Sequence, residues 1–397
     1  MFIAARRSLA LDVPALAWVH LVALGWLTMV ALSVLIHVIP TFTDVAWKDE
    51  LLARRALAVY AMGVAALVAA FWWRAVSVLP WAAILVAVGL GGYLFAALRT
   101  LAAGFAQPRV EAAIARALWT TLASLAVTAV LGVVPAWRLA GHVPLGLGMS
   151  AAPIHAAFGI IAWLTVLVMG VSTRTVRPIT GARSRIAFAH AAAGSLEIGG
   201  VIVAAVGFAF GRATIAWAGA VIVAVGALLY VSDLVDVLRR ASEKHRPPQA
   251  FLWAAGMWLL AGLALALDAL AGGGCGVAAL YVLLAGWIGQ MVNGHLYHIG
   301  IRLIATMARG EEDETPPGEL LKEPLSWVSF STFQTAILIG GLGLFFEDSS
   351  LVELAACSGF AGWLAMLVNI VGARSRAIHG QRAASGATIS LLETLRS

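Results

Sequence analysis

The chain has 397 residues, of which 61% are hydrophobic and only 12% are charged, and its formal net charge is +6. So few charged residues cannot coat a globule of this size, which excludes a water-soluble enzyme or binding domain. Its two cysteines, Cys275 and Cys357, are too few for a disulfide framework and show no metal-binding spacing.

Apolar runs of about 20 residues or more, long enough to cross a bilayer as helices, alternate with short charged strips. Runs this long and evenly apolar favour helices over the strands of a membrane barrel. The expected spans are 14–39, 53–73, 79–102, 112–137, 151–175, 186–210, 213–238, 250–271, 276–304, 327–346 and 351–373. The sequence therefore predicts an all-α integral membrane protein of about eleven helices, one polytopic membrane domain over residues 1–397, with no soluble domain.

The lysines and arginines predict how these spans are oriented. Five of the 26 lie nearest to span ends on the side of the N-terminus, and the other 21 lie on the opposite side. Because basic residues accumulate in cytoplasmic loops, the N-terminus is expected outside and the C-terminus in the cytoplasm, in a bacterial-type inner membrane. The positive net charge is thus a signal of topology, and we expect no nucleic-acid partner.

Three of the spans share a pattern of histidine and tryptophan. They contain His20 and Gly25-Trp26, His155 and Ala162-Trp163, and Gly286-Trp287 followed by His295 and His298. His37 lies eleven residues after Trp26. His298 lies at the same distance after Trp287. Because these spans are four helices apart, they run in the same direction, which predicts three four-helix units with the first helix of the first unit missing.

Six histidines fall within spans, and polar side chains inside a bilayer often mark functional sites. At about 1.5 Å per residue, His20 and His155 lie at one outer level. The other four, His37, His190, His295 and His298, lie in the inner half. A haem needs two axial imidazoles from different helices at one depth, and both levels can supply such a pair. The three remaining histidines, His142, His245 and His379, are expected to be solvated in loops or tails.

The span 186–210 contains a second group of polar residues. His190 and Glu197 are seven residues apart and therefore share one helix face, with Glu197 near the middle of the membrane. No lysine or arginine is expected at that depth, so Glu197 is either protonated and hydrogen-bonded, which we favour, or bound to a cation. His190 and Glu197 are therefore the candidate metal ligands. Asp233 and Asp236 are expected to be interfacial.

The repeat and its histidines resemble subunit I of the haem–copper oxidase superfamily, which has twelve helices in three pseudo-symmetric units and ligands on the second, sixth and tenth. Without the first helix, the ligand helices would be the first, fifth and ninth spans. Short oxidase-like proteins and the NnrS-type membrane haem proteins are also similar. The resemblance implies one or two b-type haems, with His20 as an axial ligand and His155 at the ligand position of the sixth helix. The candidate haem ligands are His20, His155, His295, His298 and His37.

The chain also departs from the oxidase pattern. His295 and His298 are spaced His-x-x-His where the tenth oxidase helix has His-x-His, and His190 stands alone where a copper site needs adjacent histidines. Gly159 occupies the position of the cross-linked tyrosine. We therefore do not expect a complete terminal oxidase or nitric oxide reductase, and a copper or non-haem iron site is doubtful.

Three functions follow from these patterns. The first is a haem b-binding, oxidase-like membrane protein that acts in electron transfer, in a response to a diatomic gas (NO or O2) or in respiratory enzyme assembly, with a cytochrome or quinone as electron donor. The second is a transporter or copper-handling permease without haem, in which the histidines and Glu197 line a path. The third is a structural subunit whose histidines form hydrogen bonds between helices.

Overall fold

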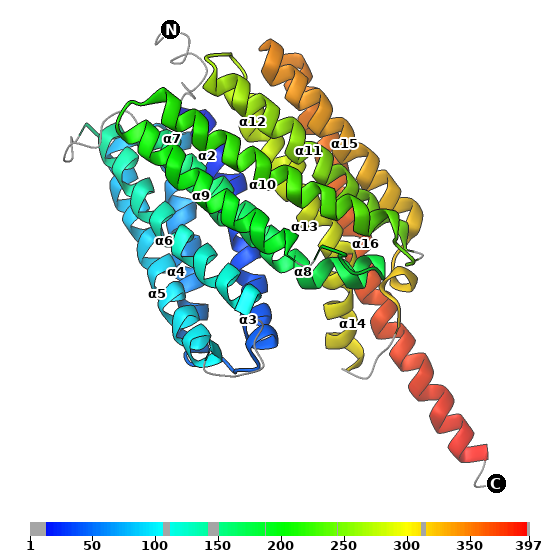
Figure 1. Ribbon diagram of the computed structural model, residues 1–397. Coiled ribbons are helices and arrows are strands. Elements are labelled where there is room, and N and C mark those ends of the chain that lie inside the picture. Colours follow the sequence, from blue (N-terminus) through cyan, green and yellow to red (C-terminus); the bar gives the residue numbers. More distant parts are fainter. Residues whose placement is uncertain are drawn as a thin grey trace. The chain divides into compact units, whose positions relative to one another are not determined.

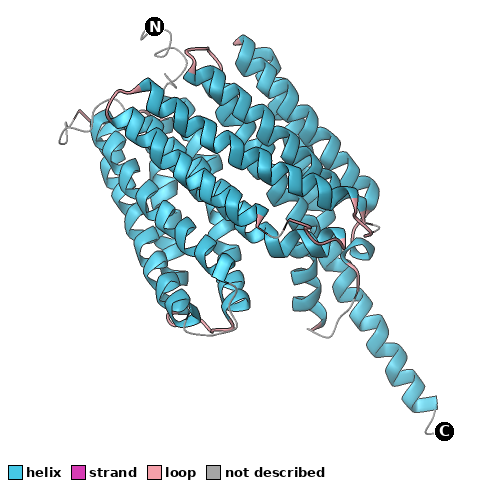
Figure 2. Cartoon of the chain, viewed as in Figure 1, coloured by secondary structure: helices cyan, strands magenta, loops and turns pink. Residues whose placement is uncertain are grey.

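The computed structural model describes residues 13–105, 112–141, 151–186, 188–243, 245–310 and 315–394. Within these ranges every regular element is a helix, joined to the next by a short connection (Figures 1 and 2). Eleven helices are long and apolar enough to cross a membrane, which confirms the predicted fold class. The chain is a multi-pass membrane protein.

Eight of the eleven spans are single continuous helices. They are α4 (Glu50–Trp72), α5 (Leu79–Phe105), α6 (Ala112–Leu139), α9 (Ala189–Ala209), α10 (Ala213–Arg239), α11 (Arg246–Leu270), α15 (Glu323–Phe346) and the first part of α16 (Ser349–Thr394). Two short 3₁₀ turns, η2 (Val76–Val78) and η6 (Pro317–Leu320), precede α5 and α15. The acidic segment 311–314, predicted to be part of a solvated loop, lies outside the described residues.

The other three spans, the first, fifth and ninth, are interrupted by π-helical turns. The first span consists of α2 (Val13–His20), η1 (Leu21–Thr28) and α3 (Met29–Thr43). The fifth consists of α7 (Ala151–Ala157), η3 (Phe158–Thr165) and α8 (Val166–Thr180). The ninth consists of α12 (Gly276–Tyr281), η4 (Val282–Ile288), α13 (Gly289–His295), η5 (Leu296–Gly300) and α14 (Ile301–Arg309). These are the three spans that the sequence predicts to be repeats.

The π-helical turns η1, η3 and η4 each contain the small residue and the tryptophan of the repeat. A π-helical turn weakens the regular hydrogen-bond ladder and is found most often at functional sites. In η1 the carbonyl oxygen of Leu24 accepts a hydrogen bond from the Tyr60 hydroxyl at 2.8 Å. In η4 the carbonyl of Ala285 accepts one from the Gln290 amide at 3.1 Å. Both carbonyls stand two residues before the tryptophan, so the repeat extends to backbone geometry.

The chain forms two compact units. Unit 1 comprises Met1–Arg174, Ser184–Asp236 and Leu263–Val277, and unit 2 comprises Thr175–Arg183, Val237–Gly262 and Ala278–Ser397. In unit 2, α15 and α16 pack along each other, and α16 continues as a helix beyond its neighbour (Figure 1). The last helix is therefore longer than the predicted span 351–373.

In unit 1, α9 and α10 form a tight antiparallel hairpin (Figure 1). They are joined by the turn predicted at Gly211 and Arg212, where Gly211 has a φ of +64°, a conformation that favours glycine. Gly219 packs against the backbone of Ala204, and Gly207 packs against that of Ala216. The two residues of each pair lie equally far from the turn, which fixes the register of the whole hairpin.

Candidate functional site

The two outer histidines, His20 at the end of α2 and His155 in α7, lie together in unit 1. Their ring centres are 6.4 Å apart, and their ring planes are inclined by only 16°. A metal ion between two imidazole nitrogens, with bonds of about 2.0 Å, places the ring centres about 6 Å apart. The separation is close to that of a pair of axial ligands, and it also lies in the range of an offset stacking contact.

Hydrogen bonds orient both rings. His20 Nδ1 lies 2.8 Å from the carbonyl oxygen of Leu16, and His155 Nδ1 lies 3.0 Å from that of Thr128 in α6. Because a carbonyl can only accept, each Nδ1 carries the proton of the neutral ring and each Nε2 keeps its lone pair. A backbone acceptor behind the other ring nitrogen is the usual arrangement of a metal-binding histidine.

The surroundings leave room for both rings. A Cβ atom added to Gly132, one turn after Thr128 in α6, would lie 2.8 Å from His155 Cε1. His20 packs on the Phe71 ring of α4 with a centre-to-centre distance of 4.9 Å. Four helical elements, α2, α4, α6 and α7, thus hold the pair in place.

A direct bond joins the first and fifth spans beneath these histidines. The indole nitrogen of Trp163 donates a hydrogen bond to the Thr28 hydroxyl at 3.1 Å. Both side chains are buried, and both lie in π-helical turns. The tryptophan of the pattern in the fifth span thus contacts the first span, so two copies of the repeat are bonded to each other.

The other three predicted haem ligands do not form such a pair within their own units. His37 in unit 1 is exposed. In unit 2, both ring nitrogens of His295 are occupied, Nδ1 by the Met291 carbonyl and Nε2 by the Thr175 hydroxyl, each at 2.7 Å. His298 lies close enough to His245 and His295 to interact with them electrostatically. A haem at the inner level stays a prediction.

Two of the three loop histidines can be compared with the structure, since His142 lies outside the described residues. His379 is exposed, as expected. His245 is not a fully solvated side chain, because both of its ring nitrogens are buried and neither has a hydrogen-bond partner among the described residues. Its ring instead packs beside Gly318 of η6. The expectation of a solvated surface histidine is therefore wrong for His245.

We expect His245 to make the protein acid-sensitive. Burial lowers the pKa of His245 from its usual 6.5, and the nearby Glu323 opposes this effect only in part. The neutral ring is therefore the stable form, and its contribution to folding is present above pH 6.5 and lost as the pH falls through the lowered pKa. Melting temperatures measured from pH 7.5 down to 5 should fall less steeply for His245→Gln than for the wild type. Parallel curves would contradict this.

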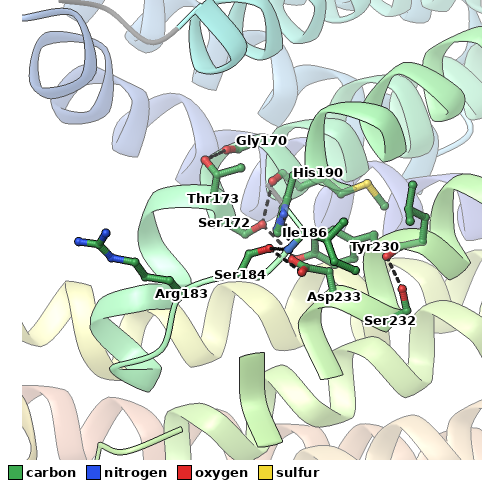
Figure 3. Close-up of polar contacts among 12 residues, drawn as sticks. Gly170, Ser172, Thr173, Arg183, Ser184, Ile186, His190, Tyr230, Ser232 and Asp233 are labelled. Atoms are coloured by element: carbon green, nitrogen blue, oxygen red, sulfur yellow. Dashed lines mark hydrogen bonds and ion pairs between the residues drawn. The ribbon is translucent and has the colours of Figure 1, made fainter. Parts of the chain in front are cut away.

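His190, the first candidate metal ligand, contacts an aspartate instead (Figure 3). Its Nδ1 lies 3.1 Å from Asp233 Oδ2, and Asp233 Oδ1 accepts a hydrogen bond from the Ser184 hydroxyl at 2.6 Å. The ring also meets Tyr230 edge-on at 5.3 Å, and the Tyr230 hydroxyl donates to Ser172 at 3.2 Å. Asp233 is fully buried within the protein, and its interfacial depth in the membrane stays a prediction.

Glu197, the second candidate metal ligand, is 1% exposed, and neither carboxyl oxygen has a hydrogen-bond partner within the described part of the chain. The hydrogen-bonded state favoured for it is therefore not seen. The residues that the structure describes contain no group of three histidine, cysteine, aspartate or glutamate side chains able to hold a metal ion. We do not carry a metal site at His190 and Glu197 into the proposed function.

The register of the α9–α10 hairpin could have identified Asp233 as the neighbour of His190 from the sequence. His190 and Asp233 lie equally far from the turn at Gly211 and Arg212, and antiparallel helices place such residues side by side. By the same rule Glu197 faces Gly226.

A scan against protein-family models finds no match to this sequence, and a search of curated proteins finds no significant similarity.

Proposed function

We propose that His20 and His155 are the axial ligands of one b-type haem in unit 1, and that the protein transfers electrons within the membrane. The observation that carries the proposal is the pair of nearly parallel imidazoles 6.4 Å apart, each with Nδ1 held by a backbone carbonyl. When bound, the haem would supply a one-electron redox centre.

Occupation of both axial positions favours electron transfer over the other activities expected from the sequence. A diatomic gas needs an open coordination position, and a haem held by both His20 and His155 would have none. The Leu16 and Thr128 carbonyls keep the two Nε2 atoms in place and raise their basicity. The electron donor is then a cytochrome or a quinone, in a bacterial-type inner membrane with the N-terminus outside.

The test is a reduced-minus-oxidised optical spectrum of the purified, haem-supplied protein, with a pyridine haemochrome assay beside it. We expect one b-type haem per chain with the spectrum of a low-spin, six-coordinate iron, unchanged by carbon monoxide. A folded protein without haem would refute the proposal and favour transport or helix packing as the role of the histidines. A carbon monoxide-sensitive spectrum would refute electron transfer but keep the haem.

Gly132 offers a sharper test of the geometry. In Gly132→Ala the new methyl group would lie 2.8 Å from His155 Cε1, so the ring must turn away from its position. Displaced supporting groups typically weaken metal binding by about 10- to 100-fold, so haem occupancy should fall on titration with limiting haem. Stability should be unimpaired, because only the end of a flexible side chain has to move. Gly91→Ala, which places its methyl group in open space, is the control.

A further inference from the structure

We propose that Glu197 carries an exchangeable proton and that the His190–Asp233 pair passes this proton between Glu197 and the membrane surface where α9 begins and α10 ends. The proposal concerns unit 1 alone and does not depend on a haem at His20 and His155.

Its first basis is the state of Glu197. A carboxylate buried without a hydrogen-bond partner or counter-ion is strongly disfavoured, and a protonated carboxyl is the alternative. The elements around it are apolar: Gly226 of α10 lies directly beside it, and the neighbouring core consists of Ala162, Val201 and Val223 with Ile161, Ile198 and Leu263 around them. Such a group binds and releases a proton only if a path leads to water.

The second basis is the His190–Asp233 pair, which lies on the same seam of the hairpin. On α9, His190 precedes Glu197 by two helical turns, and on α10, Asp233 follows Gly226 by two turns. His190 Nδ1 lies 3.1 Å from Asp233 Oδ2, which leaves Nε2 as the ring nitrogen that exchanges a proton with water. Buried carboxylate–imidazole pairs of this kind are common proton acceptors.

Hydrogen bonds orient the side chains in and around the pair. Ser184 fixes the second oxygen of Asp233, and Tyr230, the other ionisable side chain in contact, is bonded to Ser172.

The transfer conserves charge and atoms. On release, the Glu197 O–H bond breaks, its proton passes to His190 Nε2 and then leaves to water at the membrane surface, and Glu197 becomes a carboxylate. On return, a proton from water binds to His190 Nε2, that N–H bond breaks, and an O–H bond forms again on Glu197, so both residues end in their starting states. The two side chains are about 10 Å apart along the helix axis, so water molecules must relay the proton. Ala193, Gly194 and Gly226, which lie between them, have no polar side chain to take part in the relay.

The experiment is time-resolved infrared spectroscopy of the full-length protein after transfer from H2O to D2O. We expect the wild-type protein to show the C=O stretching band of a protonated carboxyl. This band should shift in frequency in D2O and should be missing in Glu197→Gln. In Asp233→Asn and in His190→Gln, the exchange of the Glu197 proton for a deuteron should be slower by about tenfold or more, because these variants lose a group that positions or carries the proton. Asp236→Asn, the same chemical change one turn nearer the surface, should leave the rate unchanged.

Either of two results would overturn the proposal. The first is a Glu197 that gives no protonated band at neutral pH, which would indicate an ionised side chain with an unrecognised partner. The second is an exchange rate that is equal in the wild type, Asp233→Asn and His190→Gln, which would show that the proton takes another route. If both variants fail to fold, Ser184→Ala, which loses the hydrogen bond to Asp233 Oδ1 and the one from the Ile186 backbone N–H, should still slow the exchange, and an unchanged rate would refute the route.

Discussion

Replacing either His20 or His155 by alanine is expected to abolish the low-spin haem spectrum of the purified protein. Each histidine would supply one of the two axial bonds, and its removal leaves either an empty cavity or a five-coordinate iron. Haem content should fall well below half of the wild-type value, and any haem that is retained should become high-spin and bind carbon monoxide. Optical and electron paramagnetic resonance spectra with a haemochrome assay measure both effects.

His37→Ala is the matched control for these variants. His37 lies on the same span as His20, but its side chain is exposed and its backbone carbonyl accepts only a local hydrogen bond from Thr41. Its loss should leave the haem content and the spectrum unchanged. If His37→Ala removes the haem while His20→Ala does not, the outer pair has been wrongly assigned.

The spans were predictable because hydropathy is a local property of the sequence. A run of about 20 predominantly apolar side chains predicts a membrane span wherever it stands in the chain, and the glycine at position 211 marks a turn by its backbone freedom. The π-helical turns were not predictable in this way. They depend on which carbonyls find a donor from another helix, as Leu24 finds Tyr60.

The sequence predicted those features of the candidate site that depend only on the depth of a residue in the membrane. His20 and His155 were expected at one level, and their rings lie 6.4 Å apart. Depth could not show that Thr175 occupies the Nε2 atom of His295, since that contact depends on the rotation of two helices about their axes. Asp233 was missed for another reason: it was judged from its distance to the membrane surface, although the hairpin register already pointed to His190.

Gly219→Ala is expected to cause a large loss of stability in unit 1. The added Cβ would meet the backbone nitrogen of Ala204 and lie 2.5 Å from the carbonyl oxygen of Gly200, and backbone atoms cannot move aside without separating α9 from α10. We expect a cost of about 3 kcal/mol relative to Gly199→Ala, in line with overpacking of a close-packed interface. Unfolding in sodium dodecyl sulfate, followed by circular dichroism, measures it.

Gly199→Ala makes the comparison direct. Gly199 lies in the same helix next to Gly200, and a Cβ added there meets nothing within 4 Å. Both glycine-to-alanine changes stabilise the helix by the same amount, about 1 kcal/mol. The difference in the free energy of unfolding between the two variants therefore reports the clash alone. Separation of the two helices would also pull Asp233 away from His190, so Gly219→Ala should slow the exchange of the Glu197 proton even where the protein stays folded. Equal stability of the two variants would mean that the helices are not in contact at this position, and the register on which the His190–Asp233 pair depends would be wrong.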